Sequence, residues 1–499
     1  MHLSPKGTKQ PNVNTFLDRS SGNLSLILAI VISSFLGALL LVKISPEVAV
    51  AAVAGLTVCI VCFVKPEAAL YLLIFSMLLS PEFGPGAEGK GSGVVLRLED
   101  FLLVLIGFSW LARMALFKEL GFFTKTALNA PIFVYLSICI LATTIGMLRG
   151  NVAPINGFFF VLKYFEYYVV YFLVVNNVRS REQIKHLVIA MLLTCMIVNI
   201  FGLSQIPGGG RVTAPFEGKI GEPNTLGGYL VLMISLSLAL TLTLNKAKSK
   251  VGMLFVVTVS IVTLLFTLSR GSYIAFFPAY LTMAFFARGK GVVLIAAIVI
   301  GAMIAPVVIP EKVVNRIAYT FTQKQQAQQK QVGGVRLDTS TSARLNQWIE
   351  GIERATTEHP FLGFGVTGYH FVDTQFVKVL VDTGYIGLFA FIYLLYSIFN
   401  ETRKIFLASN DPLYKGISLG FLGAMIGMLF HSLGANTFII IRIMETFWLW
   451  VGLIMIVPKL ETESNKVRLS MGSDTLRGAP SFPRHAFVSA RLGQARRSS

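Results

Sequence analysis

The chain has 499 residues, of which 54% are hydrophobic and only 14% are charged, and its formal net charge is +18. A soluble protein carries about 25% charged residues, so this composition excludes an ordinary soluble domain. Apolar runs recur from residue 24 to residue 457. Their length suits membrane-spanning helices rather than the shorter, alternating strands of a barrel. We therefore expect an all-α, polytopic integral membrane protein.

Three regions follow one another along the chain. Residues 1–23 are polar and do not resemble a cleaved signal, so we expect a cytoplasmic N-terminal tail. Residues 458–499 are basic and contain Pro, Gly and Ser, which indicates a disordered cytoplasmic tail. Between them, residues 24–457 form the predicted membrane domain, with about fourteen candidate spans. Their approximate limits are 24–42, 47–64, 67–80, 100–116, 128–148, 157–176, 186–206, 224–244, 251–268, 272–287, 291–309, 375–398, 416–436 and 439–457.

Lys and Arg concentrate in every second connection between these spans, as at Lys65, Arg288, Lys290 and Lys415. The positive-inside rule places these connections and both termini in the cytoplasm. The positive charge is then a topology signal, and no nucleic-acid partner is expected. The connections predicted to lie outside are 81–99, 207–223, 269–271 and the long loop 310–374, which precedes the twelfth span.

All four cysteines lie inside apolar runs, and Cys59 and Cys62 form a C-x-x-C pattern on a predicted span. A redox or metal role and the packing of small hydrophobic side chains both stay open, and the apolar context favours packing. No disulfide framework is indicated. We predict neither a metal nor a cofactor.

The long outer loop contains the run "STSARLNQWIEGIERATTEHPFLGFG". Its Leu345, Trp348, Ile349 and Ile352 fall at helical spacing, which predicts an amphipathic helix that lies on the membrane or caps a cavity. The Pro and Gly residues at the end of the run stop this helix.

Several charged residues occur within the predicted spans, where charge is costly and usually functional. They form three oppositely charged pairs at helical spacing: Lys163 and Glu166, Lys378 and Asp382, and Arg442 and Glu445. The alternative to a functional role is that the two charges of each pair simply neutralise each other within their helix. Because all three pairs fall in the outer halves of their helices, we expect a polar cavity that opens outward.

Arg211 in the second outer loop and Arg270 in the "LSRG" turn have no carboxylate within helical reach in the sequence. A basic residue in an outer turn runs against the positive-inside rule, so topology does not explain Arg270. A guanidinium group binds phosphate through paired, charge-assisted hydrogen bonds. The alternative is that Arg270 pairs with a carboxylate far away in the sequence. Gly271 is expected to permit the tight turn.

Together these segments resemble the O-antigen ligase and polymerase (Wzy-type) family of bacterial polysaccharide assembly, best over residues 200–400. They occur in the order of that family: Arg211 before "EPNTLGGYL", then "LSRG", then "STSARLNQWIEGIERATTEHPFLGFG", and last "DTQFVKVLVDTGYIGLFAF". The resemblance implies a GT-C-like membrane glycosyltransferase fold. It places the protein in the bacterial inner membrane, with its active site facing outward.

The resemblance also implies a reaction, which is metal-independent, inverting transfer of a glycan from an undecaprenyl-diphosphate carrier. Besides this substrate and the lipid bilayer, the implied partners are a chain-length regulator and a flippase of the same pathway. Where ligases of the family have His-Asn, this chain has Asp373 and Thr374. This difference favours polymerisation of repeat units into an exopolysaccharide or O-antigen over ligation to the lipid A core.

The resemblance assigns Arg211 and Arg270 to the diphosphate, and we predict Asp373 as the general base. His370, Glu217 and Glu222 are reserve bases, and Arg344 and Trp348 would hold the glycan, the latter by stacking. The predicted substrate-binding residues are Glu217, Glu222, Asn224, Lys163, Arg344, Trp348, Lys378 and Arg442. Two other classes stay open: a transporter or flippase of an anionic or lipid-linked substrate, and a structural scaffold.

Overall fold

The computed structural model describes residues 31–32, 46–83, 96–117, 124–217, 221–324, 329–332 and 335–466. These residues are almost entirely helical. The strands among them form two short antiparallel pairs, β1 (Glu82–Phe83) with β2 (Leu96–Arg97) and β3 (Gln331–Val332) with β4 (Val335–Arg336). The predicted all-α class is confirmed for this part of the chain.

A helix covers every predicted span from 47–64 onward, whereas the first span, 24–42, lies mostly outside the described residues. The helices at the predicted spans are α2 (Pro46–Val64), α3 (Pro66–Leu79), α4 (Leu98–Phe117), α5 (Asn129–Leu148), α6 (Pro154–Asn177), α7 (Arg181–Gln205), α8 (Pro223–Thr243), α9 (Ala247–Phe266), α10 (Arg270–Phe286), α11 (Gly291–Val308), α14 (Gln375–Ala408), α15 (Pro412–His431) and α16 (Ile441–Met455). Within the described part, nine helices are long and apolar enough to cross a membrane. The chain is therefore a multi-pass membrane protein.

Helices α8 and α10 pack on α15 at the centre of the bundle. Glycines of α15 allow the close approach: a Cβ at Gly420 would lie 2.5 Å from the Cα of Leu236, and one at Gly423 would lie 2.8 Å from the carbonyl of Ala279. Small residues let membrane helices approach in this way. The packing fixes the starts of α8 and α10 and the end of α15 at one end of the bundle, which we name the arginine end.

Helix α14 is broken near its start, at Gly384, whose φ is 64°. A loop that follows α13 fills the break: the Phe364 N–H donates to the Val381 carbonyl at 2.8 Å, and the Tyr385 N–H donates to the Pro360 carbonyl at 2.8 Å. A Cβ at Gly384 would collide with the backbone of Phe361. One clasp between two distant segments thus explains Gly363 of the third sequence motif and Gly384 of the fourth.

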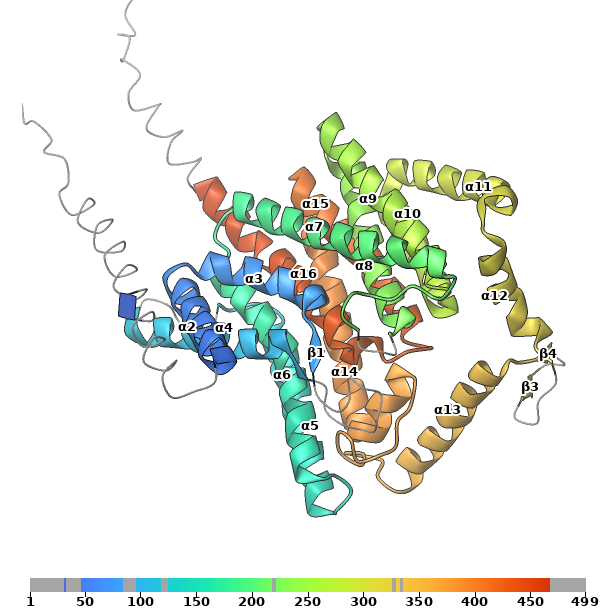
Figure 1. Cartoon of the computed structure of the whole chain (residues 1–499), viewed down its shortest axis with the longest axis horizontal. Helices are drawn as coiled ribbons and strands as arrows, with labels where there is room; N and C mark the ends of the chain where they lie inside the picture. Colours follow the sequence, from blue (N-terminus) through green and yellow to red (C-terminus); the bar gives the residue numbers. More distant parts are fainter. Residues whose placement is uncertain are drawn as a thin grey trace, which may run out of the picture. The chain divides into compact units, whose positions relative to one another are not determined.

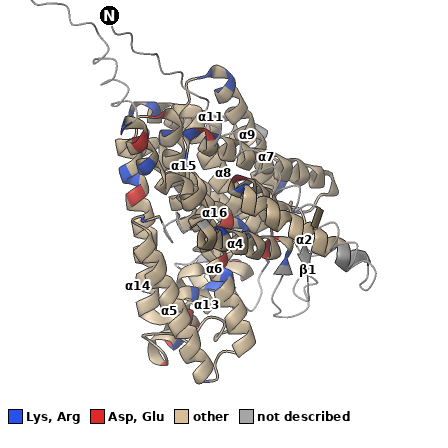
Figure 2. Ribbon diagram, turned by 90° about the vertical axis from the view of Figure 1, so that its left-hand side faces the viewer, with Lys and Arg blue, Asp and Glu red and all other residues tan. Residues whose placement is uncertain are grey.

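The long loop before the twelfth predicted span contains two helices, α12 (Glu311–Thr322) and α13 (Thr339–Thr357). The predicted amphipathic helix is α13, which packs against α14. Figure 1 shows α11, α12 and α13 following one another around one side of the central helices. In Figure 2, α14 is a long ribbon without charge along its middle, as its sequence between Asp382 and Glu401 requires.

At the C-terminus, Val457–Ser499 form a second unit. Its described part is helical as far as Lys466, beyond the predicted boundary at residue 457. The remainder of the predicted tail, 467–499, and the predicted N-terminal tail, 1–23, lie outside the described residues.

Candidate active site

Arg270 is the first residue of α10, directly after the turn that follows α9. The turn depends on Leu268, whose φ of 51° lies in the left-handed region, and on Ser269, which caps α10 by accepting from the Ser272 N–H. The prediction that Gly271 permits the turn is wrong, because Gly271 lies within the first turn of α10. The cap fixes the point at which the Arg270 side chain leaves the helix.

The Arg270 guanidinium forms an ion pair with Asp338, the N-cap residue of α13. The alternative of a sequence-distant carboxylate is therefore confirmed. Asp338 is 2% exposed and also accepts from the Thr341 N–H at 2.7 Å. Burial alone raises the pKa of Asp338, but the hydrogen bonds from Thr341 and Arg270 outweigh it, so its pKa lies below the usual value. The pair ties the start of α10 to the long loop.

Arg211 lies beside the same turn, as predicted from its shared outer location. Its Nε donates to the Thr267 carbonyl at 3.0 Å, and one terminal nitrogen donates to Asn224 Oδ1 at 3.4 Å. Asn224, in the first turn of α8, also accepts from Ser269 Oγ at 2.8 Å. The loop before α8, the start of α8 and the α9–α10 turn therefore meet at one point.

A third arginine joins the two predicted ones. Arg316 of α12 donates from Nε to the Leu268 carbonyl at 3.4 Å. Burial, followed by the positive charges of Arg316 and Arg270, lowers the pKa of Arg211, while Glu222 and Tyr273 act in the opposite direction. We name Arg211, Arg270 and Arg316 the arginine cluster. Three neighbouring cations on separate elements favour an anionic ligand.

Two carboxylates border the cluster. Arg344 donates from Nε to Asp373 Oδ2 at 3.1 Å and also contacts this oxygen through a terminal nitrogen at 3.0 Å. Among the described residues, no side chain or backbone group donates to Asp373 Oδ1. Burial, followed by the negative charge of Asp373, raises the pKa of Glu222, and Arg211 partly offsets this rise. Arg344 thus orients the Asp373 carboxylate through Oδ2, and Oδ1 accepts no hydrogen bond from the described residues.

A cavity of about 680 Å³ opens beside these residues and is mostly apolar. Ile274 and Tyr273 of α10, Leu345 of α13 and Phe430 of α15 are among the residues that line it. Its polar lining includes Arg270 and Arg344. Trp348 also faces the cavity, and its buried indole N–H has no hydrogen-bond partner in the described part of the chain. A polar group of a ligand would satisfy this donor.

The other two predicted bases, His370 and Glu217, do not line this cavity. His370 is exposed and contacts the Tyr369 ring at a tilt of 35°, with 3.9 Å between the ring centroids. It forms no hydrogen bond or ion pair with the residues that the structure describes. Glu217 is buried and accepts from the Glu222 backbone N–H at 2.9 Å, so it shapes the loop before α8.

The intramembrane charges divide into separate groups rather than sharing this cavity. Lys163 pairs with Glu166 at 3.3 Å and with Asp100, and Lys378 pairs with Asp382 at 2.6 Å. These two local pairs are confirmed, and neither lysine lines the cavity beside Arg270.

The third pair does not form, because both oxygens of Glu445 lack a hydrogen-bond partner among the described residues. Arg442 instead donates to four backbone carbonyls that come from the end of α3 and from the loop before α8. These are Leu78 at 3.1 Å, Ser80 at 3.2 Å, Pro215 at 3.0 Å and Phe216 at 3.1 Å. Arg442 thus supports the loop that carries Arg211.

Three residues of this site were not predicted from the sequence: Asp338, Arg316 and Gln347. The Gln347 side chain accepts from the Asp373 N–H at 3.0 Å. Asp338 carries a readable signal, since an Asp just before a Thr/Ser-rich helix start is a typical N-cap. Arg316 and Gln347 carry none, because their roles depend on how the long loop folds back. Among the described residues, no group of three or more His, Cys, Asp or Glu side chains is arranged to hold a metal ion.

Residues 255–426 match the model of the family described as O-antigen ligase. This segment contains α10 to α14 and most of α9 and α15, so it includes Arg270, Arg316 and the clasp at Gly384, whereas Arg211 lies outside it. No curated protein matches the chain. The match confirms the resemblance drawn from the motifs, and it supports membrane glycosyl transfer of the ligase or polymerase type.

Proposed function

We propose that this protein polymerises undecaprenyl-diphosphate-linked oligosaccharide repeat units into a surface polysaccharide. The observation that carries the proposal is the arginine cluster, whose member Arg270 lines a mostly apolar cavity. A lipid diphosphate joins a doubly charged group to a long apolar chain, and the cluster and the cavity offer one surface to each part. The proposal includes a GT-C-like fold, cytoplasmic termini and an outward-facing site in a bacterial inner membrane.

In the proposed reaction, a hydroxyl oxygen of the acceptor glycan attacks the anomeric carbon of the donor. The bond from this carbon to the diphosphate oxygen breaks, and the lipid diphosphate leaves with the electron pair, so the configuration inverts. Arg211 and Arg270 stabilise the negative charge that develops on the leaving group. Their positions are set by backbone carbonyls, by Asn224 and by Asp338 before any substrate arrives.

The hydroxyl proton passes to Asp373. Arg344 holds one carboxylate oxygen, which turns the other toward the acceptor as a general base requires. Glu222 is the reserve base, because its raised pKa lies closer to neutral pH than that of an ordinary glutamate. Trp348 receives the glycan, with its unpartnered N–H directed to a sugar oxygen.

Ligation to a lipid A core acceptor is the second candidate, favoured by the description of the matched family. Asp373 and Thr374, in place of the ligase His-Asn, favour polymerisation. The two reactions share the donor and the leaving group, and they differ only in the acceptor.

The test is to reconstitute the full-length protein in liposomes with a synthetic lipid-diphosphate-linked repeat unit. We expect lipid-linked chains of increasing length, with one lipid diphosphate released for each glycosidic bond. Transfer only after addition of a lipid A core acceptor would identify a ligase. Movement of the carrier across the bilayer without any new glycosidic bond would overturn the proposal in favour of a flippase.

A further inference from the structure

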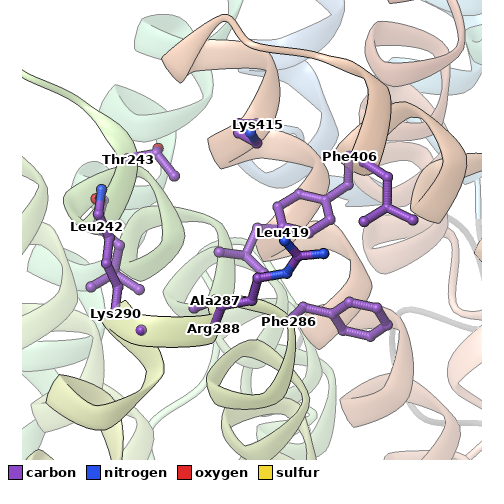
Figure 3. Close-up of a pocket in the computed structure, with 11 residues that line it drawn as sticks. Leu242, Thr243, Phe286, Ala287, Arg288, Lys290, Phe406, Lys415 and Leu419 are labelled. Atoms are coloured by element: carbon purple, nitrogen blue, oxygen red, sulfur yellow. The ribbon is translucent and has the colours of Figure 1, made fainter.

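A second cavity, of about 450 Å³, lies at the opposite end of the central helices. The end of α8, the end of α10, the end of α14 and the start of α15 surround it. The same four helices carry the arginine end at their other termini, so the two cavities are separated by the length of the bundle. Figure 3 shows this cavity with the side chains that line it.

One part of the cavity wall is apolar and well packed. Phe286 and Phe406 meet edge to face, with 6.1 Å between their ring centroids. Phe406 and Leu419 belong to a buried cluster that continues into the bundle. This wall offers a surface for a hydrocarbon chain rather than for a water-soluble ligand.

The rim of the cavity is basic. Arg288 and Lys290 follow α10 and are exposed, and Lys415 lies on the facing helix α15. In Figure 3, the Arg288 side chain reaches from its turn toward Phe406 and Leu419. Lys290 is fixed by donating from Nζ to the Leu242 carbonyl at 2.8 Å. Three cations from two elements thus surround one apolar hollow.

No acidic residue in the described part of the chain forms an ion pair with these three cations. The acidic side chains nearest to this end in the sequence are engaged elsewhere: Glu401 pairs with Lys404 at 2.6 Å, and Asp411 pairs with Arg181 at 2.6 Å. An anion entering the cavity would therefore meet uncompensated positive charge.

We propose that this cavity binds an anionic phospholipid, with its phosphate among Arg288, Lys290 and Lys415 and an acyl chain along Phe286 and Phe406. Basic pockets between membrane helices on the cytoplasmic side bind anionic head groups, and the distribution of Lys and Arg predicts that this end is cytoplasmic. A free phosphate would use the basic rim but not the apolar wall. The bound lipid would join α10 to α14 and α15.

The test is native mass spectrometry of the full-length protein in detergent, titrated with phosphatidylglycerol and, separately, with phosphatidylcholine of the same acyl chains. We expect a clear preference for phosphatidylglycerol. The double variant Arg288→Ala, Lys415→Ala should weaken phosphatidylglycerol binding about 10- to 30-fold. The matched control Lys246→Ala, Lys248→Ala removes two exposed lysines at the start of α9 and should leave binding unchanged.

Equal losses in both double variants, or equal binding of the two lipids, would overturn the proposal. Displacement of phosphatidylglycerol by an equal concentration of inorganic phosphate would show a phosphate site instead. If the double variant elutes as an aggregate, the single variant Lys415→Gln, which alters only a rim side chain, keeps the test decisive. It should weaken phosphatidylglycerol binding about 5-fold, and unchanged binding would contradict the proposal.

Discussion

The two ends of α8, α10, α14 and α15 both combine cations with apolar walls, but they hold those cations differently. At the arginine end, Arg270 is tied to Asp338 and Arg344 to Asp373, and each pair also joins separate elements of the fold. At the opposite end, none of Arg288, Lys290 and Lys415 forms an ion pair with the described residues, and the Leu242 carbonyl holds Lys290 alone. Charges fixed in advance suit a transition state of defined geometry, whereas adjustable charges suit a lipid head group.

Removal of the fixed arginines is expected to have the largest effect. Arg211→Ala and Arg270→Ala should each lower the rate of glycosyl transfer about 10²- to 10³-fold, because each removes preorganised donors to the leaving diphosphate. Arg288→Ala, at the other end, should keep the rate within about two-fold. Initial rates in proteoliposomes measure all three, with protein amount and folding checked by size-exclusion chromatography.

The partner of Arg270 supplies the control for this prediction. Arg270→Ala leaves Asp338 as a buried carboxylate without its ion pair, which could impair folding. The double variant Arg270→Ala, Asp338→Asn removes that buried charge. If the double variant recovers the wild-type rate, Arg270 serves only to neutralise Asp338, and its assignment to the diphosphate is wrong.

Replacement of the proposed base is expected to have the next largest effect on the rate of glycosyl transfer. Asp373→Asn should reduce the rate about 10²-fold, because the amide cannot accept the hydroxyl proton. Glu222→Gln should reduce the rate less than about five-fold, since Glu222 is only the reserve base. Rates at saturating donor and acceptor distinguish the two variants. The reverse order of effects would make Glu222 the base.

Trp348→Phe should raise KM for the glycan about five-fold and leave kcat nearly unchanged, because it removes one neutral hydrogen bond of about 1 kcal/mol. The matched control is Trp450→Phe on α16, since the Trp450 indole N–H also lacks a partner among the described residues but does not face the cavity. Equal KM changes in both variants would show that the Trp348 effect is one of packing.

The smallest expected effect is on the pH dependence of donor binding. The pKa of Glu222 is raised, so this carboxyl becomes neutral at a higher pH than an ordinary glutamate. Its protonation removes a negative charge beside Arg211, and donor KM should fall about two- to three-fold as the pH drops through this pKa. In Glu222→Gln, donor KM should stay at the low value throughout, and a retained pH dependence would assign it to another group.

The helices were predictable from sequence because the membrane interior demands long apolar segments with internal hydrogen bonding. The local pair of Lys378 and Asp382 was also predictable, since both residues lie on one helix face. The pair of Arg442 and Glu445 has similar spacing, yet Arg442 reaches carbonyls of distant segments instead. Sequence spacing alone does not tell whether such a pair forms, because the carbonyls that bind Arg442 in place of Glu445 are brought near it only by tertiary packing.

The site itself was predictable only in part. Arg211 and Arg270 were predicted to share one location, and Arg211 does lie beside the turn that precedes Arg270. Asp338 lies 68 residues from its partner Arg270, and that pairing requires the long loop to fold back. The break of α14 at Gly384 depends on the inserted loop around Phe361, and neither segment alone specifies it.

Binding measurements test whether the arginine cluster holds the diphosphate. Undecaprenyl diphosphate and undecaprenyl monophosphate share the same apolar chain and differ in the charged group. In nanodiscs, we expect the wild-type protein to bind the diphosphate at least about tenfold more tightly, and the Arg211→Ala, Arg270→Ala variant to lose this preference. An unchanged preference in the variant would contradict the claim.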